Sequence, residues 1–212
     1  MVVTYQLSMR LTSWFVQKGL LKQQEYDVYV YCIDSLMSKL FFYIILFAAA
    51  VWFHILPQTV WYYTGFTAFR YTAGGYHADS DKACMVLTWA VYIASMLLVQ
   101  WLAEGSAVWS AVLAVCLVLF GTLTAIKQAP VDHFNKPVSA ARKQLMRKRC
   151  LRFQMLFVLL TVFLLAKQAM LYALCLALGN GIAAAFLLFA YYQKKGGNHA
   201  RSTYLPVSVT AF

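Results

Sequence analysis

Long apolar runs without a single charge constrain the fold of this chain more than any other feature. Residues 40–56, 83–103 and 107–126 are the clearest of these runs. As helices, they are long enough to cross the roughly 30 Å hydrocarbon core of a bilayer. The composition agrees, because 62% of the residues are hydrophobic and 12% are charged, whereas about a quarter are charged in soluble domains. We therefore expect an integral membrane protein.

Shorter runs complete the predicted bundle. Residues 153–166 and 168–193 are further expected spans, and Gly179-Asn180-Gly181 is expected to interrupt the second of them. Pro57 is expected to lie in a turn, and the aromatic-rich residues 59–69 that follow fit either a short tilted pass or a re-entrant segment held against protein. The predicted fold is all-α, a polytopic integral membrane helical bundle with about six passes, counting this one.

The chain is expected to form a single membrane domain, 1–212, in three parts. Residues 1–39 are a predicted N-terminal helical segment on the cytosolic side, residues 40–193 the transmembrane bundle, and residues 194–212 a cytosolic tail. In the first part, apolar residues recur at helical spacing with basic residues between them, and Gly19 is expected to break the segment. Two placements fit this pattern: a basic amphipathic helix on the inner leaflet, or a helix packed on the protein itself.

The basic residues give an orientation. The formal net charge is +11, but the basic residues gather at the ends of the apolar runs, which argues for topology rather than for nucleic-acid binding. With six passes, every Lys and Arg except Lys167 falls on one side, which the positive-inside rule makes cytosolic. That side includes a predicted polar loop, residues 127–152. Two explanations fit the positive charge of this loop. In one, it sets the topology and contacts anionic lipid, a contact worth roughly 1 kcal/mol per basic residue. In the other, it attracts an acidic segment of a substrate.

The stretch from Arg70 to Cys84 holds the candidate chemistry. His77 and Cys84 lie close in sequence, and an imidazole can take the proton of a thiol and later return one to a leaving group. Helix-capping residues, namely Asp79, Ser80 and Asp81, precede the next span, so we expect Cys84 in the first turn of a helix, where the dipole stabilises anions. On one continuous helix, residues i and i+7 lie about 10 Å apart. A break between His77 and Cys84 is therefore required.

The other candidate groups are less promising. Cys32, Cys116 and Cys175 have no histidine nearby in sequence, and Cys150 lies among basic residues without a local base. We interpret these four as ordinary small apolar residues. No metal site is expected, because the remaining histidines are far apart in sequence and no HExxH motif occurs.

The motif Arg70-x-x-x-Gly-Gly-Tyr-His-Ala followed by Cys84 resembles the signature of the accessory gene regulator protein B (AgrB) family. Ala129-Pro130-Val131-Asp132, then Asn135-Lys136-Pro137, resembles the loop that follows the middle spans in that family. The order and lengths of the segments are similar over nearly the whole chain. The family is described as membrane cysteine endopeptidases that process the precursor of an autoinducing peptide in Gram-positive quorum sensing.

The resemblance implies specific roles. Cys84 would be the nucleophile and His77 the general base and acid, without a cofactor. The partners would be an AgrD-like precursor, the lipid bilayer of a Gram-positive cell membrane and a second copy of the chain in a homodimer. Arg70, Gly74 and Gly75 match motif positions and would bind substrate, Arg70 as a carboxylate clamp and the glycines as a passage for its backbone. Alternatively, Arg70 is a snorkelling residue beside a plain turn. Helix capping explains Asp79 and Asp81 without catalysis.

A rival hypothesis comes from another class of protein. The chain would be a non-enzymatic membrane exporter, or a docking partner for a signalling peptide, with Cys84 inert. Substitution of His77 or Cys84 distinguishes the two hypotheses, because only the protease needs both side chains.

Overall fold

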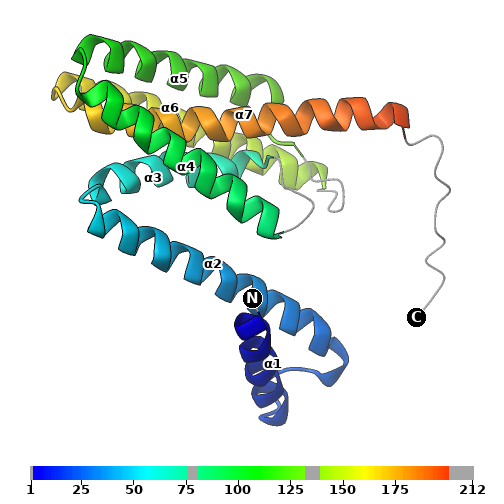
Figure 1. Ribbon diagram of the computed structural model, residues 1–212. Coiled ribbons are helices and arrows are strands. Elements are labelled where there is room, and N and C mark those ends of the chain that lie inside the picture. The colour runs from blue at the N-terminus through cyan, green and yellow to red at the C-terminus, as the bar shows by residue number, and fades with distance from the viewer. Residues whose placement is uncertain (1, 76–80, 132–138, 201–212) are drawn as a thin grey trace. The chain divides into compact units, whose positions relative to one another are not determined.

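The computed structural model describes residues 2–75, 81–131 and 139–200 (Figure 1). These residues are almost entirely helical, which confirms the predicted all-α class. A short 3₁₀ turn, Gln23–Glu25, precedes the second helix. The α-helices are α1 (Val2–Gln17), α2 (Tyr26–Trp52), α3 (Leu56–Ala73), α4 (Asp81–Ala103), α5 (Ala107–Gln128), α6 (Ala140–Ala166) and α7 (Met170–Ala200).

The chain divides into two compact units, residues 1–56 and 57–212. In the first unit, α1 packs on α2, and the break between them falls at Gly19, whose φ of +70° favours glycine. Ser8 and Thr12 of α1 are fully buried. The hydroxyl of Tyr26 donates a hydrogen bond of 3.2 Å to the Met9 carbonyl. The structure therefore shows α1 packed on the protein itself.

Within the residues that the structure describes, five segments are long and apolar enough to cross a membrane: Gln23–Trp52, Ala83–Ala103, Ala107–Gln128, Ala140–Ala166 and Met170–Gln193. The aromatic-rich segment that follows Pro57 is a regular helix of 18 residues, α3. Aromatic side chains of α3, including Tyr62 and Phe69, are buried in the bundle. α3 is thus a full-length helix rather than a brief one, and its role as a sixth pass stays a prediction.

The predicted turn at Pro57 is wrong by a few residues. α2 ends at Trp52, His54 has a φ of 57°, and Pro57 is already the second residue of α3. Proline is well accommodated in the first turn of a helix, where its missing N–H leaves no hydrogen bond unmade. α2 also begins well before residue 40 and continues through the expected boundary at residues 39–40.

The predicted polar loop 127–152 is largely helical. α5 extends to Gln128, and α6 begins at Ala140 and runs for 27 residues, about 40 Å at the helical rise. Its first half is rich in Arg, Lys, Gln, Leu and Met, which are strong helix formers whatever their polarity. Arg147 donates a hydrogen bond of 3.1 Å to the Ile126 carbonyl near the end of α5. Likewise, α7 continues to Ala200, so the expected tail begins as helix.

The expected interruption of the last span at Gly179-Asn180-Gly181 is also wrong, because α7 is continuous there. A Cβ atom at Gly179 would overlap the carbonyl oxygen of Tyr62 in α3, and one at Gly181 would lie 2.7 Å from the Leu117 side chain in α5. Small residues let helix backbones approach closely inside a membrane. The glycines therefore serve helix packing, and Asn180 between them is fully buried.

Candidate active site

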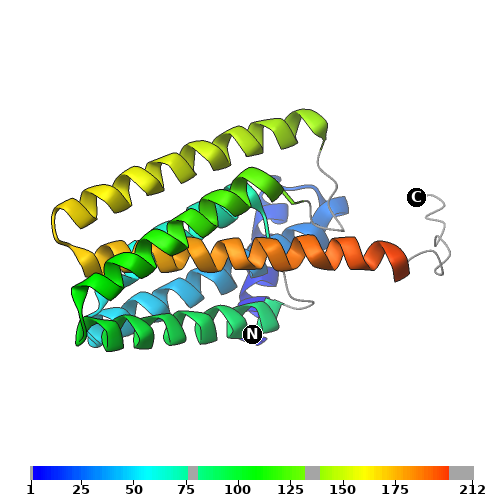
Figure 2. The same cartoon turned by 90° about the horizontal axis from the view of Figure 1, so that it is seen from above.

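The site candidates that the structure describes, Arg70, Gly74, Gly75 and Cys84, lie toward one end of the second unit. Its helices α4 to α7 run antiparallel to their neighbours in sequence, so the turns at residues 104–106 and 167–169 lie at the opposite end (Figure 2). The end of α3, the start of α4, the segment after α5 and the basic half of α6 are then together at the site end. The end of α3 and the segment after α5, which are far apart in sequence, therefore lie at the same end.

Cys84 lies in the first turn of α4, which begins at Asp81. It is a free cysteine with a partly buried side chain. Its carbonyl accepts a hydrogen bond of 2.8 Å from the hydroxyl of Thr88 one turn later. The position matches the expected place of a thiol whose anion a helix N-terminus would stabilise.

His77 lies outside the described residues, as do Asp79 and Ser80. α3 ends at Ala73 and α4 begins at Asp81.

Arg70, in the last turn of α3, is held against two aromatic rings. The centre of its guanidinium group lies 5.6 Å from the ring centroid of Phe66 and 5.3 Å from that of Phe186 in α7. The two rings are themselves edge to face, with centroids 6.1 Å apart. Cation–π contacts of this kind orient a guanidinium group. Sequence reasoning missed Phe186, because nothing in its spacing connects it to the motif.

Gly74 and Gly75 have φ values of +80° and +143°, in the region that other residues rarely adopt. Gly74 forms a parallel β-bridge with Val131. The Val131 N–H donates a hydrogen bond of 3.1 Å to the Ala73 carbonyl. A Cβ atom at Gly74 would lie 2.6 Å from the Val131 carbonyl oxygen. The structure thus joins the glycine pair to the proline-containing segment, a contact that the sequence did not predict.

The four remaining cysteines are free. Cys150 and Cys175 are buried, whereas Cys32 and Cys116 are exposed on helices that can face lipid. Cys150, in the basic half of α6, is 1% exposed and therefore does not open to the surface.

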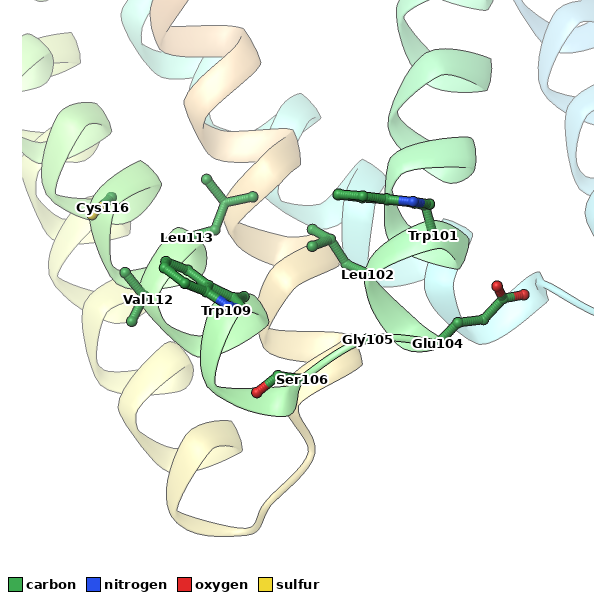
Figure 3. A pocket seen from close by; sticks show the side chains of 9 residues that line it. All are labelled: Trp101, Leu102, Glu104, Gly105, Ser106, Trp109, Val112, Leu113 and Cys116. Atoms are coloured by element: carbon green, nitrogen blue, oxygen red, sulfur yellow. The ribbon is translucent and has the colours of Figure 1, made fainter.

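Two grooves lie away from Arg70, Gly74, Gly75 and Cys84. One, of about 660 Å³, follows the turn between α4 and α5 and includes Trp101, Glu104, Trp109 and Cys116 (Figure 3). It is at the far end of α4 from Cys84. The other, of about 600 Å³, is in the first unit between α1 and Tyr26. Within the described part of the chain, His, Cys, Asp and Glu side chains form no group of three that could hold a metal ion.

The described helices define a multi-pass membrane protein, with a thiol in the first turn of α4 at the end of the bundle where α3 and α5 end and α6 begins. Accessory gene regulator B is the family that matches, over residues 8–190. No curated protein and no solved structure matches the chain. Because the family match covers most of the sequence, the chain belongs to the accessory gene regulator B family. Its general role is therefore in the processing of an autoinducing peptide, with a peptide precursor and the membrane as partners.

Proposed function

We propose that this protein is a membrane cysteine endopeptidase that cleaves the C-terminal part of an AgrD-like precursor of an autoinducing peptide. The observation that carries the proposal is the place of Cys84, partly buried in the first turn of α4 and just after the motif that also contains His77. The family membership supplies the substrate class.

In the proposed first step, the His77 imidazole takes the proton from the Cys84 Sγ atom, and the thiolate attacks a carbonyl carbon of the precursor. The C–N bond of the peptide then breaks, and His77 returns the proton to the departing amine. The products are the released C-terminal tail and a thioester between the precursor and Cys84. No cofactor takes part in this sequence.

In the proposed second step, a nucleophile within the precursor captures the acyl group. A cysteine thiol gives a cyclic thiolactone, and a serine hydroxyl gives a lactone. Thiol capture exchanges one thioester for another, so the bond energy is roughly conserved and the ring closes without an external energy source. The nucleophile's proton is transferred to the Cys84 sulfur, which regenerates the thiol.

The proposed location of the site is the cytosolic face of a Gram-positive cell membrane. Support comes from the distribution of charge, because the site end of the second unit carries Lys127 and the basic half of α6, whereas Lys167 lies at the opposite end. The positive-inside rule places such an end in the cytosol. Both chain termini are proposed to lie on the cytosolic side as well. The protein is also proposed to form a homodimer.

Arg70 is proposed to bind the substrate. Its guanidinium is oriented by Phe66 and Phe186, which suits it to a carboxylate of the precursor or of the released tail. Gly74 and Gly75 would contribute through their backbone, since both lack a side chain that could obstruct an approaching peptide.

The test is reconstitution of the protein in liposomes with the precursor encoded beside its gene, followed by mass spectrometry. We expect cleavage by the parental protein, no cleavage by Cys84→Ser or His77→Ala, and a thioester adduct on a peptide containing Cys84. Cys116→Ser is the matched control, because Cys116 is exposed on α5 and outside the proposed site. Cleavage by a correctly inserted Cys84→Ser variant would reject the protease and favour the exporter or docking partner.

A further inference from the structure

A short extended segment after α5 holds the end of α3 through its backbone. Ala129 is the first residue beyond α5, and its N–H still donates to the Ala125 carbonyl at 3.2 Å. Two residues later, the Val131 N–H donates to the Ala73 carbonyl at 3.1 Å, and Val131 forms the bridge with Gly74. The path from α5 to α3 is therefore short and hydrogen-bonded at both ends.

α5 is itself firmly anchored in the bundle. Gly121 packs directly against the Asn180 side chain of α7, where any Cβ atom would overlap the Asn180 Oδ1 atom. Gln154 of α6 donates to the Thr122 hydroxyl of α5 at 3.2 Å and to Asn180 at 3.1 Å. A segment that extends directly from α5 is consequently fixed relative to α6 and α7.

The end of α3 also rests on α7. A Cβ atom at Gly75 would be 3.8 Å from the Leu187 backbone nitrogen, an ordinary packing distance. Arg70 contacts the Phe186 ring of the same turn of α7. Among the described residues, the hydrogen bond from Val131 to Ala73 is the one backbone hydrogen bond that joins this end of α3 to a segment outside α3.

We infer that the Val131 backbone N–H and the missing side chain of Gly74 position the motif for catalysis, so that Val131 and Gly74 are positioning residues of the proposed protease. The inference rests on the proposed function. Val131 touches neither substrate nor the reacting sulfur in this account. It fixes Ala73, the last residue of α3, which is four residues before His77 in the sequence. In enzymes, a misplacement of about 1 Å can lower the rate on the order of a hundredfold.

The test separates the N–H group from the side chain. Val131→Ala keeps the N–H donor, whereas Val131→Pro removes it. Gly74→Ala places a Cβ atom 2.6 Å from the Val131 carbonyl oxygen and strains φ. Gly19→Ala is the matched control, because it has the same kind of strain at φ +70° with no atom within 4 Å of its Cβ.

The assay is precursor cleavage in liposomes, with kcat and KM measured separately and thermal unfolding measured on each purified variant. We expect kcat to fall at least tenfold in Val131→Pro and Gly74→Ala, on the scale of such misplacements. The fall in kcat should exceed what the unfolded fraction of each variant accounts for, and KM should stay near the parental value in Val131→Pro, which changes no proposed substrate-binding residue. Val131→Ala and Gly19→Ala should cleave at close to the parental rate.

Three results would overturn the inference. They are parental kcat in both Val131→Pro and Gly74→Ala, an equal loss in Val131→Ala, or a loss that merely follows the unfolded fraction. If both variants fail to fold, hydrogen exchange of the parental protein decides: a Val131 amide that exchanges as fast as in an unstructured peptide contradicts the contact, and a protected one supports it. Failure of the proposed function itself is distinct, because Cys84→Ser would then cleave like the parental protein.

Discussion

Asn180 and Gln154 exchange two hydrogen bonds between α7 and α6. The Asn180 Nδ2 atom donates to Gln154 Oε1 at 2.8 Å, and Gln154 Nε2 donates to Asn180 Oδ1 at 3.1 Å. Both side chains are at most 1% exposed. Since a buried amide without a partner is unfavourable, the pair specifies how α6 and α7 align along their lengths.

Replacement of one member of this pair should destabilise the bundle. Gln154→Leu removes both hydrogen bonds that Gln154 makes with the buried Asn180 amide, and Asn180→Leu removes the donor to Gln154 Oε1, although Gln154 Nε2 still reaches Thr122; each should cost about 1–3 kcal/mol. The double variant should lose less than the sum of the two single losses, because neither amide is then orphaned. The measurement is the free energy of unfolding in mixed micelles. Thr64→Ala is the control, since Thr64 is exposed and bonds only within its own helix. Strict additivity would contradict the coupling.

Gly179→Ala should disturb the contact between α3 and α7. Its Cβ atom would overlap the Tyr62 carbonyl, which is backbone and can move only with the whole helix. We expect a loss of stability of about 1–3 kcal/mol, the usual cost of overpacking, measured by thermal unfolding in detergent. Gly105→Ala is matched to it, because the nearest atom to its Cβ is at an ordinary 3.6 Å. Equal stability of the two variants would refute the close packing.

Thiol labelling should separate the cysteines by exposure. Cys84 should react with an alkylating reagent near neutral pH, and more slowly in His77→Ala if the imidazole assists its deprotonation. Cys150 and Cys175 should stay unlabelled until the protein is unfolded, because both are buried. Peptide mass mapping after timed alkylation measures all of these rates together. Rapid labelling of Cys150 in the folded protein would contradict the burial of its thiol.

Charge reversal on α6 tests whether its basic surface recruits an acidic part of the precursor. Lys148 and Arg149 are exposed, whereas Arg147 also caps the end of α5 through the Ile126 carbonyl. The informative variant is therefore Lys148→Glu with Arg149→Glu, with Arg147 left in place. Recruitment predicts a higher KM for the precursor that depends on salt, with kcat unchanged. Unchanged processing by the correctly inserted variant would leave topology as the explanation of the charge.

Much of the helical arrangement could be predicted from the sequence, because long uncharged runs have few alternatives in a membrane. The errors come from local signals, namely the proline at Pro57, the polarity of 127–152 and the glycines at 179 and 181, none of which excludes a helix. The basic residues from Arg142 to Arg152 are good helix formers and continue α6 beyond its apolar part. Glycines often mark the end of a helix, yet Gly179 and Gly181 lie inside α7, where their lack of a side chain lets α3 and α5 approach closely.

The candidate site was only partly predictable for a different reason. The place of Cys84 near a helix start follows from local capping residues, which a sequence displays directly. The contacts of Arg70 with Phe186, and of Gly74 with Val131, join residues that are distant in sequence. Local patterns contain no information about such partners. Proximity of this kind depends on how α3, α5 and α7 pack together.

The bridge between Gly74 and Val131 has a consequence for exchanging parts between members of this family. Consider a chimera that receives residues 70–75 from a relative but keeps its own residues 129–131. Its two contacting segments would come from different proteins and would not be complementary. The two segments should therefore be transplanted as a pair. Four proteins, with neither, either or both segments exchanged, would show whether substrate preference transfers with one segment or only with both.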